Sequence, residues 1–270
     1  MQFRLNQVIS TISARGIIFP FALLGAVILL FIAIPLFKMV FGSDPGILLE
    51  TFLDPNVTSS IWLTIYAALL ATAVGCLLGV PLAYLLARYE FPGKRFLEGL
   101  IDLPIVVPHT AAGIALLFVF GRNFLIGGAL ENIGLRFVDT TAGIVIAMLF
   151  VSVPFLIDSA KGGFQQVDVR LERVARTLGA SQWQTFRRVS LPLAWRSILS
   201  GNIMMWARGI SEFGAVIILT YHPMIAPILV YERFQAQGLD YAQPVAVILI
   251  LVSIFIFITL RAFIYRKDRR

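Results

Sequence analysis

The sequence predicts an all-α integral membrane protein with six transmembrane helices. Hydrophobic residues make up 59% of the 270 residues and charged residues only 14%, and the mean hydropathy is +0.87, so the composition is far from that of a soluble domain. The apolar residues also gather in runs of about 20 or more, the length that a helix needs to cross a bilayer. Because backbone groups in hydrocarbon must be paired within the segment, and the alternation typical of barrel strands is absent, these runs predict helices.

The first apolar run is too long for the core of a signal peptide and no small-residue cleavage site follows it, so we expect it to remain as a span. The second contains Cys76, the only cysteine, which excludes an intrachain disulfide. The third begins with Pro104 and Pro108, which loosen a helical hydrogen-bond ladder. In chain order, the six predicted spans are residues 17–41, 60–87, 100–121, 140–160, 197–219 and 243–265.

Basic residues lie mainly on one side of this predicted membrane topology. The side of the N-terminus holds 17 of the 22 Lys and Arg residues, so the positive-inside rule places both termini and the loop 161–196 in the cytoplasm. The outermost members of this set are Arg4 and Arg15 at one end, and Arg261, Arg266, Lys267, Arg269 and Arg270 at the other. The net charge of +7 follows from this topology and does not indicate nucleic-acid binding. We expect one multi-pass domain over residues 1–270, because no internal repeat or low-complexity linker divides the chain.

The loop 161–196 has the pattern of two short helices. Asp168 can cap the first helix, and Gly179 suits the left-handed position that ends it. Ser181 and Gln184 form a capping box for the second helix, which Leu191-Pro192 should break. The first helix has an apolar stripe of Leu171, Val174, Ala175 and Leu178, and the second an apolar edge of Trp183, Phe186 and Val189. Two interpretations remain open: the helices rest on the protein's own membrane domain, or they dock on a partner subunit.

This loop resembles the cytoplasmic EAA loop of ABC-transporter permeases, in which a glycine is followed after nine residues by a hydrophobic residue, any residue, Leu and Pro. Gly179-Ala180-Ser181 is followed at that spacing by Val189, Leu191 and Pro192. The acidic half departs from the motif, because Glu172 lies seven residues before Gly179 rather than six. Glu172 is included in the predicted ATPase-coupling loop, although Arg173-Val174-Ala175 occupies the place of the motif's acidic triplet.

The resemblance implies the fold of a type I ABC importer permease whose loop fits a groove on a separate ATPase subunit. The chain has no G-x-x-x-x-G-K-[ST] phosphate loop. We therefore expect no cofactor and no enzyme activity on this chain, and expect ATP and Mg²⁺ to bind the partner. No metal site is expected either, since the two histidines, His109 and His222, are predicted to lie apart.

Two polar clusters interrupt the predicted spans. A charge at the centre of a span costs about 2.5–3.5 kcal/mol, and Arg208 and Glu212 are spaced so that they can pair on one helix face beside Ser211. The pair either fixes helix packing or lines a path in which Arg208 contacts an anion. The second cluster is at the start of the third span, where we expect a kink with a hydrogen-bonded histidine, and consists of Asp102, Pro108, His109 and Thr110.

The stretches DLPIVVPHTAAGIALL (102–117) and ARGISEFGAVI (207–217) resemble the molybdate and tungstate branch of the ABC permeases, which is close to the sulfate branch. The resemblance implies a prokaryotic cytoplasmic-membrane importer of a tetrahedral oxyanion. Its partners would be a second copy of the chain, two ATPase subunits and an extracellular binding protein. A sulfate or thiosulfate permease and an ion-coupled secondary transporter remain as alternatives.

Overall fold

The structure is a computed structural model that describes residues 2–265, with side chains described from 18 to 260 and at 262. Every regular element in these residues is helical, which confirms the predicted all-α class. The side chains of the basic residues near both termini, Arg4, Arg15, Arg261, Arg266, Lys267, Arg269 and Arg270, lie outside the described residues. Contacts divide the chain into two compact units, Met1–Glu50 and Thr51–Arg270.

The first unit consists mainly of one long helix, α1 (Gln2–Phe41). Its apolar part, Ile18–Phe41, has the length and hydropathy of a membrane span. Asp44 then accepts hydrogen bonds from the amides of Gly46 and Ile47, which caps the start of α2 (Pro45–Leu53).

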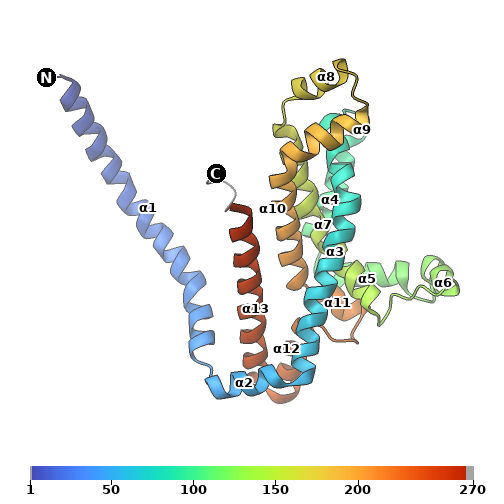
Figure 1. The fold of residues 1–270 in the computed structure, drawn as a ribbon. Coiled ribbons are helices and arrows are strands. Elements are labelled where there is room, and N and C mark those ends of the chain that lie inside the picture. The colour runs from blue at the N-terminus through green and yellow to red at the C-terminus, as the bar shows by residue number, and fades with distance from the viewer. Residues whose placement is uncertain (1, 266–270) are drawn as a thin grey trace. The chain divides into compact units, whose positions relative to one another are not determined.

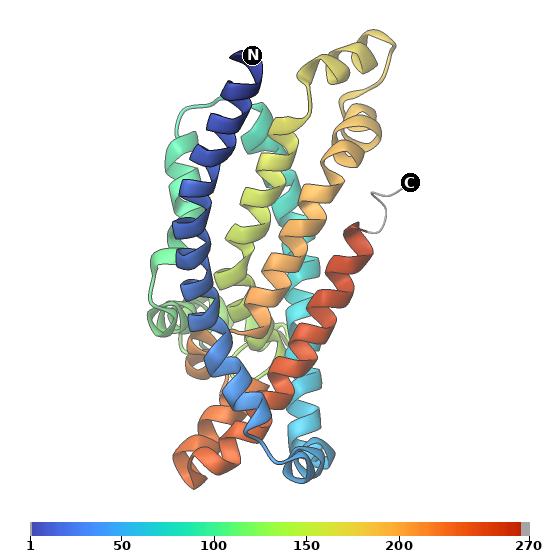
Figure 2. The ribbon, with the colours of Figure 1, turned by 90° about the vertical axis from the view of Figure 1, so that its left-hand side faces the viewer.

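The second unit is built on three long helices, α3 (Pro55–Arg88), α7 (Thr141–Gln166) and α10 (Leu191–Ile210). Figure 2 shows α7 (yellow-green) and α10 (orange) running side by side. Small residues allow this close approach, because a Cβ on Gly163 of α7 would overlap the Cβ of Ser197 of α10. α13 (Leu239–Tyr265) follows α12 (Ala226–Gln237) and packs on both α12 and α10.

Within residues 2–265, four helical stretches have the length and apolar composition of membrane spans: Ile18–Phe41, Pro55–Arg88, Thr141–Gln166 and Leu239–Leu260. The third expected span, 100–121, is not one helix. It is split into α4 (Lys94–Val106) and α5 (His109–Phe120), and the chain bends by 115° between the two helices. Val107 and Pro108 form the break, because the residue before a proline is driven out of the helical conformation.

The fifth expected span, 197–219, is also wrong as a single helix. α10 ends at Ile210, and α11 (Gly214–Leu219) begins after a three-residue break. Conversely, the break expected at Leu191-Pro192 does not occur. Helical backbone continues from α9 (Gln182–Thr185) through a π-helical turn, η1 (Phe186–Ser190), into α10. The wider turn accommodates a proline that cannot donate a hydrogen bond to the preceding turn.

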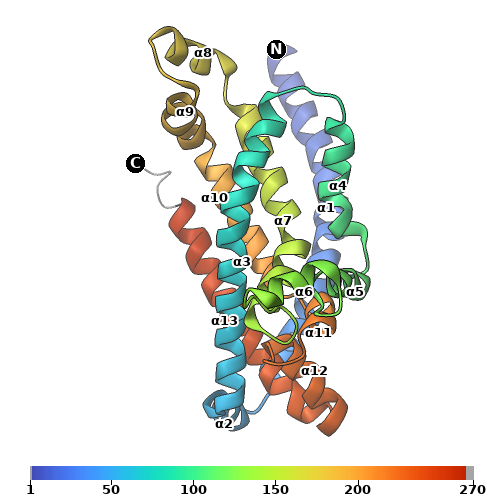
Figure 3. The ribbon, with the colours of Figure 1, turned by 90° about the vertical axis from the view of Figure 1, so that its right-hand side faces the viewer.

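Different short helices lie toward the two ends of the second unit (Figures 1 and 3). α8 (Val169–Thr177) and α9 lie at one end of the bundle, beyond the last turns of α3 and α7. α11, α12 and α6 (Leu125–Asn132) lie in the half away from α8. The two predicted polar regions, the 168–192 segment and the intramembrane cluster, therefore occupy different levels of the unit.

Candidate functional site

Local hydrogen bonds fix the shape of the 168–192 segment. Asp168 accepts the amide of Arg170 at 2.8 Å, so it caps α8 as predicted. Gly179 has a φ of +90°, and the amides of Gly179 and Ala180 donate to the carbonyls of Arg176 and Ala175, both over 3.0 Å. This is a Schellman ending. Ser181 and Gln184 exchange the two hydrogen bonds of a capping box over 3.2 and 2.8 Å, which confirms the predicted turn between α8 and α9.

Three of the four members of the predicted apolar stripe of α8 face away from the chain's own membrane unit, and the fourth, Ala175, is half-buried. Leu171 is 49% exposed, Val174 55% and Leu178 83%. Trp183 of α9, which follows the turn at Gly179, is 66% exposed. Large apolar side chains exposed on two adjacent short helices outside the apolar spans are typical of a docking surface. We call Leu171, Val174, Leu178 and Trp183 the docking surface.

The side chains of the predicted apolar edge of the second helix do not all point the same way. Trp183 points out, whereas Phe186 and Val189 are half-buried. The Phe186 ring lies 4.9 Å from that of Tyr84 on α3 and 5.5 Å from that of Trp183, measured between ring centroids. Phe186 therefore connects the docking surface with the core of the unit.

Glu172 is the buried member of α8, at 5% exposure. It pairs with Arg88, the last residue of α3, and accepts a hydrogen bond from Ser190. Glu172 was predicted as a member of the ATPase-coupling loop, but nothing in the sequence singled out Arg88 or Ser190 as its partners. The only local signal was a lone arginine at the end of an apolar run.

The structure brings together His109 of α5, Arg208 in the last turn of α10, and Ser211 and Glu212 of the break that follows α10. Arg208 NH2 lies 2.8 Å from His109 Nε2 and 3.0 Å from Glu212 Oε2, and its NH1 donates to Ser211 Oγ over 3.3 Å. His109 Nδ1 is 3.1 Å from the same Glu212 oxygen. Arg208 NH2 also lies 3.0 Å from His109 Nδ1, so the guanidinium approaches both ring nitrogens, and the tautomer decides which of them accepts its hydrogen bond.

The Glu212 side chain is only 2% exposed, whereas the Arg208 and His109 side chains are 23% and 39% exposed. The carboxylate is therefore enclosed, and the two nitrogen-bearing side chains keep access to the surface of the unit. The kink with a hydrogen-bonded His109 is confirmed. An arginine held in this way can contact a passing anion.

The other residues predicted for the path are placed differently. Pro108 forms the break before α5, and Thr110 is exposed in its first turn. Asp102 lies on α4, close enough to Asp158 of α7 for the two carboxyl groups to interact. Of the predicted set, the structure shows His109, Arg208, Ser211 and Glu212 in one cluster. The described residues include no group of three or more His, Cys, Asp or Glu that could hold a metal ion.

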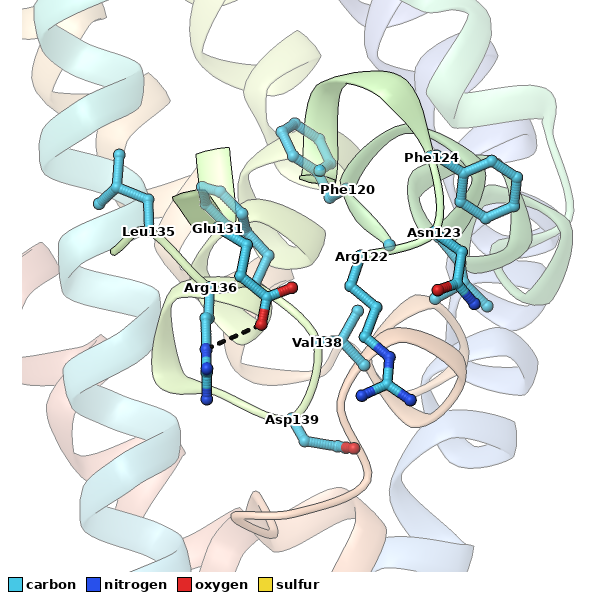
Figure 4. A pocket seen from close by; sticks show the side chains of 13 residues that line it. Phe120, Arg122, Asn123, Phe124, Glu131, Leu135, Arg136, Val138 and Asp139 are labelled. Carbon is cyan, nitrogen blue, oxygen red and sulfur yellow. Dashed lines mark ion pairs between the residues drawn. The ribbon is translucent and has the colours of Figure 1, made fainter. Parts of the chain in front are cut away.

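A separate pocket of about 480 Å³ lies between the end of α5, α6 and the loop that precedes α7 (Figure 4). Arg136 and Glu131 pair across 3.0 Å on one side of it. Asp139 accepts the amide of Tyr221 over 3.1 Å, so the loop is tied to the segment after α11. With Arg122 also in the lining, this pocket has basic and acidic groups in equal number.

Both the sequence and the fold are similar to those of known proteins. Residues 79–270 match the family described as "Binding-protein-dependent transport system inner membrane component". The chain is 48% identical over 246 residues to the molybdate/tungstate transport system permease protein WtpB of Pyrococcus furiosus, covering 90% of this chain and 93% of that protein. The corresponding protein of Thermococcus kodakarensis is 44% identical over 251 residues, with 92% and 96% covered.

More distant proteins are also similar. A probable sulfate transport system permease protein of Chlorella vulgaris is 31% identical over 235 residues, covering 86% of this chain and 88% of that protein. The crystal structure of a bacterial ABC transporter involved in the import of alginate includes a chain with a TM-score of 0.72 at 18% identity, covering 94% of this chain and 96% of that one. At that identity the likeness concerns the fold alone. With 192 of its 270 residues inside the family match, the chain belongs to the binding-protein-dependent transport system inner membrane components.

Proposed function

We propose that this chain is the membrane-spanning subunit of an ATP-driven importer for a tetrahedral oxyanion, molybdate or tungstate. The structural observation that carries the ATP-driven part is the docking surface, because four large apolar side chains are exposed at one end of the unit on a segment shaped by three capping motifs. A separate ATPase subunit would cover this surface. Such burial would remove apolar area from water and so favour association.

The choice of substrate is supported by similarity. The relatives at 44–48% identity are molybdate/tungstate permeases, and the sulfate relatives are at 31–34%. Arg208 is the residue best suited to contact such an anion, because its guanidinium presents several donors in a planar fork. His109 and Ser211 add polar groups beside it.

The complete importer would contain two copies of this chain, two ATPase subunits and an extracellular binding protein that delivers the anion. In this arrangement the docking surface faces the cytoplasm, in keeping with the excess of Lys and Arg around it. ATP binding would draw the two ATPase subunits and the docked segments together and open the path outward. ATP hydrolysis would return the transporter to a state in which the path opens to the inside.

The test is purification of the tagged full chain from its native membrane, followed by mass spectrometry and an ATP hydrolysis assay. We expect an ATPase subunit at equal stoichiometry, and hydrolysis stimulated by the binding protein loaded with molybdate or tungstate. Stimulation by sulfate alone would point to the sulfate branch. A chain that purifies alone and transports under an ion gradient would overturn the proposal in favour of a secondary transporter.

A further inference from the structure

Arg88 connects three parts of the unit that are distant in sequence. Its Nε lies 2.8 Å from Glu172 Oε1 of α8, and its NH2 donates to the carbonyl of Val167 over 3.0 Å. Ser190, the last residue of η1, donates to the same Glu172 oxygen over 2.7 Å. The end of α3 is therefore bonded to the residue that follows α7, to α8 and, through Glu172, to η1. We call Arg88, Glu172 and Ser190 the joint.

The joint is enclosed. The side chains of Arg88 and Glu172 are each 7% exposed, and Ser190 is fully buried. The attraction between two opposite charges is stronger when they are shielded from water than when they lie at the surface. Leaving either charge buried without its partner would destabilise the fold. A cavity of about 170 Å³ lies beside the pair and is lined by both Arg88 and Glu172.

A second contact connects the same elements. Tyr84, one turn before Arg88 on α3, lies 5.2 Å from Phe164 of α7 and 4.9 Å from Phe186 of η1, between ring centroids and edge to face. Phe186 in turn stacks on the exposed Trp183. Such ring pairs stabilise the contact by more than the burial of their apolar area alone would. A continuous row of rings therefore leads from the docking surface to α3 and α7.

Chain connectivity explains how the segment could move α7 and α10, since α7 runs into α8 and η1 runs into α10. Nothing in the connectivity joins the segment to α3. We propose that Arg88 and Glu172 are positioning residues that make the end of α3 part of the coupling segment, so that a moving ATPase displaces α3 together with α7 and α10. This inference rests on the proposed function, because it assigns a role within ATP-driven transport.

The direct test removes both charges together, in Arg88→Met/Glu172→Gln, because a single change would leave one buried charge without its partner. The complete transporter is reconstituted in vesicles, and molybdate taken up is compared with ATP hydrolysed. We expect the variant to retain its ATPase subunit and to hydrolyse ATP, while uptake per ATP falls roughly tenfold. The control is Glu98→Gln, which removes the ion pair that joins α4 to Lys161 of α7 at 3.3 Å and leaves Lys161 paired with Asp158, so it should leave uptake per ATP unchanged. Wild-type uptake per ATP in the double variant would overturn the inference.

A reversible covalent link provides a second measurement, independent of any effect on folding. Arg88→Cys/Glu172→Cys is built in a Cys76→Ser background, so that a short bis-methanethiosulfonate reagent can bridge only the two new thiols within a chain. We expect uptake per ATP to be low before bridging, to recover after bridging and to fall again on reduction. If bridging does not restore coupling, α3 and α8 do not need to move as one body and the inference fails. Failure of the proposed function is distinguishable, because the wild-type transporter itself would then show no ATPase partner or no oxyanion uptake.

Discussion

Arg208 NH2 donates to Glu212 Oε2 over 3.0 Å across the break between α10 and α11. The other oxygen of Glu212 accepts the amide of Ala215 over 2.8 Å, at the start of α11. One carboxylate thus holds the last turn of α10 and satisfies an amide that α11 would leave unpaired. The pair therefore fixes the place at which the expected fifth span is interrupted.

Arg208→Ala should abolish uptake and lower the stability of the purified protein. It would leave the enclosed Glu212 carboxylate without its cation, which typically costs about 3–5 kcal/mol. Adding Glu212→Ala removes the stranded charge, so we expect thermal unfolding in detergent to return toward the wild-type temperature while molybdate uptake remains absent. Uptake restored in the double variant would show that the pair is only structural. Arg136→Ala, which removes an exposed pair with Glu131, is the control and should change stability little.

Gly179→Asp should uncouple ATP hydrolysis from uptake and leave the membrane unit folded. The left-handed backbone at φ +90° strains a residue with a Cβ by roughly 1–2 kcal/mol, and the turn that sets α9 against α8 would change. Gly134→Asp is a matched control, because Gly134 has φ +87° and ends α6 with the same Schellman hydrogen bonds. Uptake per ATP should fall in the first variant and not in the second. An equal loss in both would mean that strain alone, and not the place of the turn, causes the defect.

Trp183→Ala should weaken the attachment of the ATPase subunit, since large aromatic side chains dominate the binding energy of many interfaces, with losses of about 2 kcal/mol or more on truncation. Trp62→Ala is the control, because Trp62 of α3 is also 66% exposed but lies outside the docking surface. The measurement is the amount of ATPase that remains bound to the tagged chain after washing. If both variants retain the wild-type amount and transport normally, Trp183 is not an anchor.

The sequence predicted most successfully those features that depend on neighbours in the chain. The cap at Asp168, the left-handed turn at Gly179 and the capping box at Ser181 each require residues within five positions, and all three are confirmed. The apolar stripe was also predictable. Whether that stripe is exposed or covered was not, because exposure depends on where α8 lies relative to the rest of the unit.

The joint shows what the sequence could not reveal. Arg88 and Glu172 are 84 positions apart, and no spacing rule relates residues on different helices. The break at Ser211–Phe213 was missed for a similar reason. It contains no proline, and it is stabilised by the Glu212 carboxylate and by Arg208, whose pairing was predicted as i, i+4 within an unbroken helix.

Asp54, which lies before the first turn of α3, should make the unfolding temperature of the protein depend on pH in acidic solution. The amide of Asn56 donates to its carboxylate, and Arg233 pairs with it at 2.6 Å; both lower the pKa of Asp54 below its ordinary value of 3.8. A carboxyl with a lowered pKa in the folded state stabilises that state above the unfolded value, and this contribution is lost as the pH falls from 3.8 through the folded value. In Asp54→Asn the decline in unfolding temperature over that range should be smaller than in wild type. An identical decline would show that the pair contributes no pH-dependent stability.

The packing of α7 on α10 can be tested with two adjacent glycines. A Cβ on Gly163 would overlap the Cβ of Ser197, where Ser159 Oγ also donates to the Ser197 carbonyl over 2.7 Å. A Cβ on Gly162 would meet no atom within 4 Å. Both glycines lie in the same helix, so Gly163→Val and Gly162→Val share the same propensity effect and differ in packing. Overpacking costs about 1–3 kcal/mol, so we expect only Gly163→Val to lower the unfolding temperature and the yield of folded protein. Equal unfolding temperatures for the two variants would mean that α7 and α10 separate readily at this level, and that their close approach contributes nothing to stability.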